Sequence, residues 1–203
     1  MTAIIDYDAG NLKSVSKALE RLGFDGVITS SEKEISNSKA MILPGVGAFG
    51  DCMNSLKDKG LDQCIIKNVQ EGKYLLGICL GMQMLFEESY EDGVWDGLGL
   101  LEGDVVRFNA DLDLKIPHMG WNNLIANGTD TIGKNIEAGE FVYFVHSYYA
   151  QPKNDEDVVF YTEYDVKVPA VVRKNNVIGM QFHPEKSGQT GMQLLKNFGE
   201  LIK

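Results

Sequence analysis

The chain of 203 residues is long enough to bury a sizeable core, and its composition, 44% apolar and 24% charged, is that of a globular protein rather than a disordered or fibrous one. Acidic residues outnumber basic ones by 29 to 19, so the net charge of −10 argues against nucleic acid or anionic lipid as a partner. The three cysteines lack the spacing of a disulfide framework or a zinc site, so we expect free thiols and no metal. We see neither a secretion signal nor a membrane span in the sequence, so we expect a cytoplasmic protein.

The first half of the chain alternates short apolar runs with stretches of helical periodicity, which predicts β-α-β units and a mostly parallel sheet. The expected strands are residues 3–6, 27–29, 41–43 and 74–78. We expect Asn11 to cap the first helix, because it follows a turn and precedes apolar residues at helical spacing. The expected helices are residues 12–22, 51–57, 61–70 and 82–88.

The second half of the chain reads differently, because strand and turn signals dominate from Asp104 to Gln181. Strands are expected at residues 105–108, 141–145, 158–161, 170–173 and 177–181, followed by a final amphipathic helix over 190–202. We therefore predict one α/β domain over residues 1–203. Its mostly parallel central sheet is flanked by helices and extended by an antiparallel or mixed strand region.

The strongest local signal is the pentapeptide Gly77-Ile78-Cys79-Leu80-Gly81, which lies between an expected strand and an expected helix. This is the glycine-flanked elbow that presents a nucleophile at the carboxyl end of a sheet. A thiol at a helix N-terminus is favoured as thiolate, and the amide of Leu80 points to where an oxyanion would form. On the pentapeptide alone, Cys79 is as easily interpreted as a small buried apolar residue.

A thiolate that cleaves an amide also needs an acid to protonate the leaving amine. Of the three histidines, His183 directly follows an expected strand, and Glu185 lies close enough to orient its imidazole. The loop Pro44-Gly45-Val46-Gly47, after the strand at 41–43, has the glycines that let backbone N–H groups face a ligand. By itself this loop is also consistent with an ordinary strand-to-helix connection.

Taken together, these motifs resemble those of the class I (triad) glutamine amidotransferases. Within them the chain is similar to the glutaminase subunits of imidazole glycerol phosphate synthase. The resemblance runs from end to end and rests on the motifs DYDAGN (6–11), PGVGAF (44–49), GICLGMQ (77–83), PHMGWN (117–122), FVHSY (144–148) and HPEKS (183–187).

The resemblance implies a concrete site without a cofactor. Cys79 would attack the side-chain amide of L-glutamine, His183 would move the protons, and Glu185 would orient His183. The oxyanion would be held by backbone N–H groups of Leu80 and Val46. The substrate would be bound by the loop at Gly47 and by Gln83, Glu91, Ser147 and Tyr148, although this chain has Tyr90 where the acidic run of the family usually continues.

The resemblance also implies a heterodimer with a (β/α)8-barrel cyclase subunit. The barrel would receive ammonia through an internal channel and make imidazole glycerol phosphate and AICAR in histidine biosynthesis. Trp121, Tyr143, Lys186 and Asn11 would face it. For Trp121 and Tyr143 the alternative is core packing, and for Lys186 it is a solvated surface charge.

Three other functions stay open at this stage. A paralogous subunit could supply ammonia to an enzyme that modifies a surface-polysaccharide sugar. The chain could instead be a non-catalytic regulatory subunit, although the intact Cys79, His183 and Glu185 argue against this. It could also be a cysteine hydrolase of esters or peptides, against which the set Gln83, Ser147 and Tyr148 argues.

Overall fold

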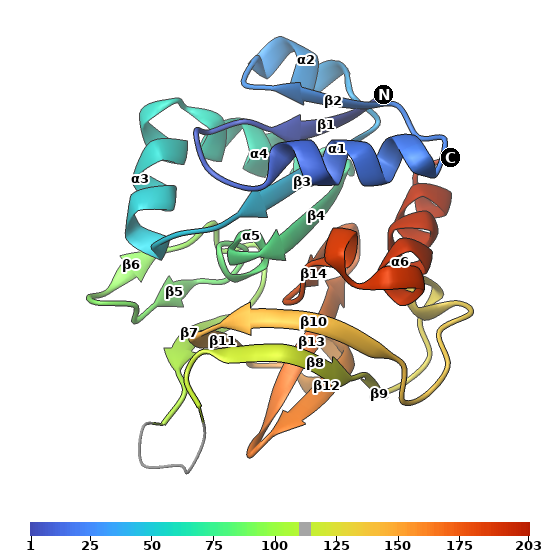
Figure 1. Ribbon diagram of the computed structural model, residues 1–203. Coiled ribbons are helices and arrows are strands. Elements are labelled where there is room, and N and C mark those ends of the chain that lie inside the picture. The colour runs from blue at the N-terminus through green and yellow to red at the C-terminus, as the bar shows by residue number, and fades with distance from the viewer. Residues whose placement is uncertain (110–114) are drawn as a thin grey trace.

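The computed structural model describes residues 1–109 and 115–203, and its centre is an eight-stranded sheet (Figure 1). Five strands at one side of this sheet are parallel and the remaining ones are antiparallel, so the predicted mostly parallel sheet with an antiparallel extension is confirmed. In spatial order the strands are β2 (Gly26–Thr29), β1 (Thr2–Ile5), β3 (Ala40–Gly45), β4 (Tyr74–Cys79), β14 (Val177–Met180), β13 (Val166–Lys174), β12 (Val158–Tyr164) and β9 (Ile125–Ala126).

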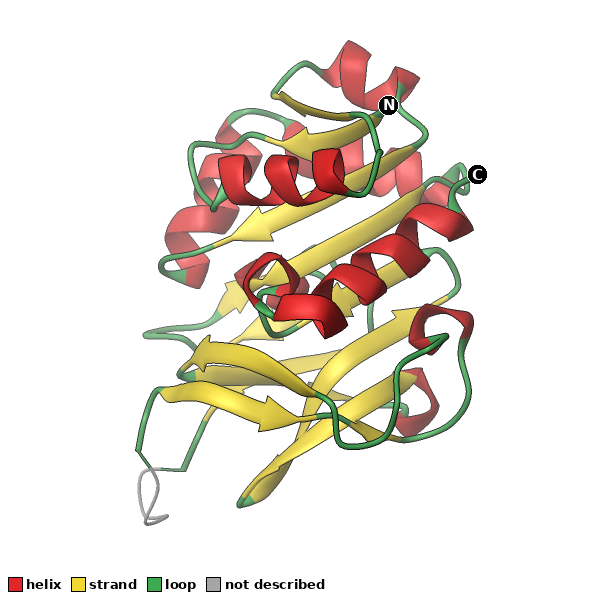
Figure 2. Ribbon diagram, turned by 45° about the vertical axis from the view of Figure 1, so that its right-hand side comes forward, coloured by secondary structure: helices red, strands yellow, loops and turns green. Residues whose placement is uncertain are grey.

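Helices cover both faces of the parallel part, as Figure 2 shows from the side. Because successive side chains of a strand point to opposite faces, Met41 joins one core and Ile42 the other. The core around Met41 contains side chains of α2 (Glu32–Asn37), α3 (Phe49–Asp58) and α4 (Leu61–Gln70), and the core around Ile42 those of α1 (Leu12–Arg21) and α6 (Gly188–Leu201). A strand that is buried on both faces has a continuous run of apolar residues, so the strands of the parallel part could be predicted from the sequence.

The remaining strands form two smaller sheets. The strands β8 (His118–Asn123) and β10 (Phe141–His146) form an antiparallel ribbon, which we call the β8–β10 ribbon. In Figure 1 it lies below the parallel strands. A four-stranded sheet contains β11 (Tyr148–Pro152), β7 (Gly103–Arg107), β5 (Glu88–Ser89) and β6 (Trp95–Asp96).

The predicted helix over 82–88 is wrong from residue 84 onward. The helix α5 covers only Leu80–Gln83, and β5 begins at Glu88. The carbonyl groups that would continue the helix accept hydrogen bonds from a distant segment instead: Met84 from Leu98, and Phe86 from Gly99. This pairing ends the helix one turn after the elbow and turns the chain back beneath the sheet.

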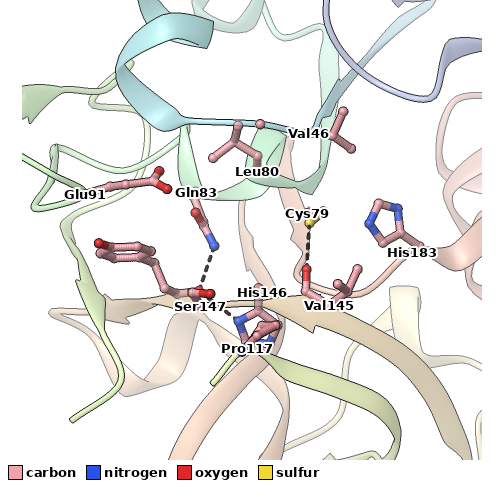
Figure 3. A pocket seen from close by; sticks show the side chains of 12 residues that line it. Val46, Cys79, Leu80, Gln83, Glu91, Pro117, Val145, His146, Ser147 and His183 are labelled. Carbon is pink, nitrogen blue, oxygen red and sulfur yellow. Dashed lines mark hydrogen bonds between the residues drawn. The ribbon is translucent and has the colours of Figure 1, made fainter. Parts of the chain in front are cut away.

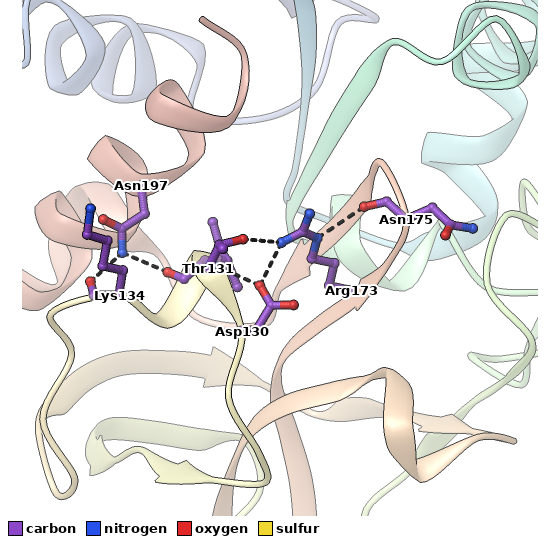
Figure 4. Close-up of polar contacts among 7 residues, drawn as sticks. Asp130, Thr131, Lys134, Arg173, Asn175 and Asn197 are labelled. Atoms are coloured by element: carbon purple, nitrogen blue, oxygen red, sulfur yellow. Dashed lines mark hydrogen bonds and ion pairs between the residues drawn. The ribbon is translucent and has the colours of Figure 1, made fainter.

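A polar cluster ties the connection between β9 and β10 to the main sheet and to α6 (Figure 4). Arg173 of β13 donates from Nη1 to Asp130 Oδ1 and Thr131 Oγ1, both at 2.7 Å. Asn197 of α6 donates to the carbonyl groups of Ile132 and Lys134, which belong to or follow the 3-10 turn η1 (Thr131–Gly133). The segment that leads into the β8–β10 ribbon is thereby held against the core. Two further 3-10 turns are η2 (Asp155–Asp157) and η3 (Pro184–Lys186).

Candidate active site

Three neighbouring parallel strands deliver the sequence-predicted groups to one place. The strands β3, β4 and β14 lie side by side, and their carboxyl ends carry the loop at Val46, the elbow at Cys79 and the segment that leads to His183. Because parallel strands end at the same edge, residues about 140 positions apart in the chain, such as Val46 and His183, meet there around one cavity.

The elbow at Cys79 is a strained turn held by close backbone packing. Cys79 has φ 55° and ψ −114°, a conformation that non-glycine residues rarely adopt. A Cβ at Gly77 would lie 2.5 Å from the carbonyl oxygen of Gly81, and one at Gly45 would lie 2.6 Å from the amide nitrogen of Gly81. The missing side chains therefore let β3 and β4 approach the start of α5. Strain of this kind is typical of a positioned nucleophile rather than of a core cysteine.

His183 and Glu185 form a buried pair beside the thiol. Nδ1 of His183 lies 3.1 Å from Oε1 of Glu185, and both side chains are almost fully buried. Burial alone would lower the pKa of His183, but the hydrogen bonds to Cys79 and Glu185 and the charges of these groups outweigh it and raise the pKa to about 9. The raised pKa favours the protonated form of His183 at neutral pH, and this form pairs with Glu185 and is suited to giving a proton to a leaving amine.

A cavity of about 350 Å³ opens over the thiol (Figure 3). Its size falls in the ~300–1,000 Å³ range of small-molecule sites. The sequence-predicted residues that line it are Val46, Gly47, Cys79, Leu80, Gln83, Glu91, Ser147, Tyr148 and His183. Glu185 is absent from the lining because it stands behind His183. The residues that sequence reasoning missed are Pro117, Val145 and His146, all contributed by the β8–β10 ribbon or the residue preceding it.

Two polar side chains in the cavity are already oriented by the protein. Gln83 donates from Nε2 to the carbonyl group of Tyr148 at 2.9 Å and to Oε1 of Gln181 at 3.0 Å. Glu91 accepts through Oε2 from the backbone N–H of Phe49 at 2.7 Å, and burial raises the pKa of its carboxyl group. The presence of Tyr90 has not moved Glu91 out of the site, because Glu91 lines the cavity.

Gln181 and Tyr7 also support the site and were not singled out from the sequence. Gln181 is fully buried, and its Nε2 lies 4.0 Å from the sulfur of Cys79. The hydroxyl group of Tyr7, also fully buried, donates to the carbonyl group of Pro44 at 2.7 Å and so fixes the start of the Pro44–Gly47 loop. The only available signal was their position inside the motifs QFHPE and DYDAGN.

Of the residues expected to face a partner, Trp121 and Lys186 are exposed, whereas Tyr143 and Asn11 are half-buried. Trp121 is 56% exposed on the β8–β10 ribbon, so its interpretation as a core residue is wrong. Tyr143 is half-buried with its ring edge-on to Trp121, and Lys186 is exposed. Asn11 stands at the N-cap position of α1 and is half-buried, but its side chain makes no capping hydrogen bond, so the predicted cap is wrong in that respect.

Within residues 1–109 and 115–203, no group of three or more His, Cys, Asp or Glu side chains is arranged to hold a metal ion. None of the helices in the same ranges combines the length and the apolarity that crossing a membrane requires.

Comparisons with known proteins agree with this geometry. The glutamine amidotransferase class-I family profile matches residues 3–201. Imidazole glycerol phosphate synthase subunit HisH of Geobacillus sp. (strain WCH70) is 52% identical, with 100% of this chain and 98% of that protein covered. The subunit of the same name from Bacillus subtilis (strain 168) is 49% identical, over 99% of this chain and 96% of that protein. A solved structure of PurLQS from Thermotoga maritima aligns with a TM-score of 0.78 at 24% identity, covering 100% of this chain and 98% of that one, and supports the fold.

Proposed function

The chain belongs to the class-I glutamine amidotransferase family, and on that premise we propose that it is the glutaminase subunit of an imidazole glycerol phosphate synthase in histidine biosynthesis. The observation that carries the chemistry is the meeting of Cys79, His183 and Glu185 at adjacent strand ends, beneath a cavity of amino-acid size. The identity of about half of all residues to named HisH subunits supports the pathway.

Bond cleavage follows from the placement of the thiol and the imidazole. The sulfur of Cys79 attacks the side-chain carbonyl carbon of glutamine, and the developing oxyanion accepts hydrogen bonds from the N–H groups of Leu80 and Val46. The first-turn N–H groups of α5, Leu80 among them, have no acceptor within the helix. Because Nδ1 of His183 is bonded to Glu185, its Nε2 is the nitrogen that gives a proton to the departing ammonia.

Hydrolysis of the resulting thioester uses the same groups in reverse. His183, now neutral, takes a proton from water, and the water oxygen attacks the thioester carbon. The carbon–sulfur bond breaks, the sulfur takes the bonding electron pair, glutamate leaves, and His183 again carries a proton. Glu185 keeps the imidazole oriented through both halves of the reaction.

Recognition of glutamine as a free amino acid needs a group for its ammonium and groups for its carboxylate. Glu91 offers a carboxylate: Oε2 accepts from the N–H of Phe49, and Oε1 accepts no hydrogen bond from residues 1–109 or 115–203. Ser147 and Tyr148 offer hydroxyl groups, Gln83 offers an amide oxygen, and Gly47 offers its backbone in a conformation, φ 108°, that favours glycine. We assign the whole chain, residues 1–203, to one glutaminase domain.

A partner subunit is implied by the subunit names of the relatives and by the chemistry, because ammonia released into water would be wasted. We assign this partner as a (β/α)8-barrel cyclase that docks on the β8–β10 ribbon. Three large apolar side chains stand out from that ribbon, namely Met119, Trp121 and Phe141, exposed by 61%, 56% and 55%. Exposed apolar side chains grouped in this way are typical of an interface. The three free cysteines suit a reducing compartment such as the cytoplasm.

The test measures glutamate release from glutamine by this chain alone, then with the cyclase subunit and its nucleotide substrate from the same genome. Slow release alone and strong stimulation by the pair are expected. Release without any response to that cyclase would keep the glutaminase and assign it to another acceptor, such as a sugar-modifying enzyme. Absence of release in both cases would refute the proposed chemistry.

A further inference from the structure

A continuous chain of buried polar groups leads from the β8–β10 ribbon to the nucleophilic sulfur. Its members, in spatial order, are Asn122, His118, His146, the carbonyl group of Tyr148, Gln83, Gln181 and Cys79. We propose that Gln181 is a further catalytic residue that donates an N–H to the sulfur of Cys79, and that His118 and His146 are positioning residues that hold the carbonyl group of Tyr148, from which the hydrogen bonds leading to Gln181 take their direction. This inference rests on the proposed function, in which Cys79 is the nucleophile.

The direction of the chain can be worked out from the carbonyl group of Tyr148, which can only accept. Gln83 approaches it at 2.9 Å, so the atom that Gln83 presents there must be its Nε2. The same nitrogen lies 3.0 Å from Gln181, so the atom of Gln181 that accepts this hydrogen bond must be Oε1. The other end of the Gln181 amide, its Nε2, is thereby directed at the sulfur of Cys79.

His146 also bonds this carbonyl group, and His118 bonds His146 in turn. Nδ1 of His146 lies 2.8 Å from the Tyr148 oxygen and must carry the proton, which leaves Nε2 as the acceptor of a neutral ring. Nδ1 of His118, 3.0 Å away, donates to that Nε2. Nε2 of His118 then accepts from the side-chain amide of Asn122 at 3.3 Å.

Burial keeps these rings in the neutral form that the chain requires. It lowers the pKa of His118 to about 4 and that of His146 to about 3. The ring of His118 is also clamped between Phe144 and Tyr164, with ring centroids 4.6 Å and 4.0 Å away. Reversing one bond of the chain would leave two donors or two acceptors face to face in a buried site, which is costly.

The backbone of Gln181 is as well fixed as its side chain. Its N–H donates to the carbonyl group of Ala170 at 2.9 Å, and Met180 next to it pairs with Ile78 in the parallel register of β14 and β4. One residue further along each strand, Gln181 and Cys79 come side by side. The sheet register itself therefore sets the contact between amide and sulfur.

Two chemical consequences follow for glutamine hydrolysis. The sulfur, which also lies 3.9 Å from the carbonyl oxygen of Val145, gains an N–H donor at 4.0 Å from Gln181 beside the imidazole of His183, and a donor stabilises sulfur in its anionic, attacking form. Gln83 donates both of its amide hydrogens, one to Tyr148 and one to Gln181, so only its side-chain oxygen is available to a ligand in the cavity. An oxygen acceptor suits the N–H groups of glutamine and disfavours the carboxylate of the product glutamate.

The experiment compares the wild-type complex with Gln181→Met, which keeps the side-chain length and removes the amide. Gln70→Met, an exposed glutamine at the end of α4, is the matched control. We measure kcat and KM for glutamate release, and the rate at which iodoacetamide alkylates Cys79 at pH 7, localised by mass spectrometry. Expected for Gln181→Met is a fall of about tenfold in kcat with KM changed less than threefold, and slower alkylation of Cys79.

A second pair of variants tests the chain at a distance from the sulfur. His118→Phe keeps the ring stacking and removes both hydrogen bonds, whereas His118→Asn restores a donor at the position of Nδ1. A severalfold loss of kcat in the first and recovery to within twofold of wild type in the second are expected.

The failures of the two proposals are distinguishable. Wild-type rates in Gln181→Met would overturn the inference, and so would faster alkylation of Cys79, because that indicates a loosened fold rather than a lost donor. Equal losses in His118→Phe and His118→Asn would remove the positioning role. A wild-type complex that releases no glutamate would refute the proposed function, while the alkylation rates would still test the contact between Gln181 and Cys79.

Discussion

The substitution Gly45→Ala tests the packing that holds the Pro44–Gly47 loop against the elbow at Cys79. We call this segment the oxyanion loop, because we assign to the N–H of Val46 a hydrogen bond to the oxyanion. A Cβ at position 45 would lie 2.6 Å from the amide nitrogen of Gly81 and 2.9 Å from Cβ of Leu80, where ordinary contact begins at 3.4 Å. The neighbouring backbone atoms cannot yield as a flexible side chain could. The end of β3 must therefore move away from α5 by several tenths of an ångström, and the N–H of Val46 moves with it.

Such a displacement acts on the transition state more than on bound glutamine. Loss of one oxyanion donor costs about 10²–10³ in kcat, and a shift of about 1 Å can cost about 10². We therefore expect kcat for glutamate release by the complex to fall at least about 30-fold, with KM changed little. The matched control is Gly128→Ala, because a Cβ at Gly128 meets no atom within 4 Å. If Gly45→Ala is folded by circular dichroism and keeps kcat within threefold of wild type, the oxyanion loop has been assigned incorrectly.

Three further predictions concern the triad, the interface and the buried histidines. Glu185→Gln removes the charge that helps to raise the pKa of His183 to about 9. We expect kcat to fall by about 10²–10⁴ and the basic limb of the pH profile of kcat/KM to move to lower pH. An unmoved limb would contradict the pairing of His183 with Glu185. Trp121→Ala should weaken association with the cyclase by about 2 kcal/mol or more in titration calorimetry, whereas an unchanged dissociation constant would remove Trp121 from the interface. The pKa values of His118 and His146 lie below their ordinary value of 6.5, so the unfolded chain binds more protons than the folded chain between about pH 6.5 and pH 4. The free energy of unfolding should therefore fall as the pH is lowered through this range. The fall should be smaller in His118→Phe, and an equal fall would show that His118 is not buried as a neutral ring.

Much of the site could be predicted because its residues follow apolar strands. The strand at Tyr74–Cys79 is buried on both faces and therefore reads as a continuous apolar run, and the glycines around Cys79 mark the elbow. His183 and Glu185 are only two positions apart in the chain, so their contact could be predicted without knowing the fold.

The parts that could not be predicted depend on contacts between distant segments. Strand β8 has the sequence HMGWNN, in which the inward positions are His118, Gly120 and Asn122. Its apolar residues Met119 and Trp121 are exposed, so the usual pattern of apolar residues facing a core is absent. The early end of α5 is set by hydrogen bonds from Leu98 and Gly99. The contact of Gln181 with Cys79 joins residues 102 positions apart and requires the register of β14 beside β4.

The measurement that tests the central claim most directly is covalent trapping with a glutamine-like diazoketone, followed by mass spectrometry of the digested protein. If the cavity binds glutamine and Cys79 attacks its side-chain carbonyl carbon, the reagent should form one adduct, on the peptide that contains Cys79. Excess glutamine should protect this peptide, and Cys79→Ala should abolish the adduct while the complex still forms. An adduct on Cys52 or Cys64, or labelling only by an ester-directed reagent, would contradict the assignment of Cys79 as the nucleophile of a glutaminase.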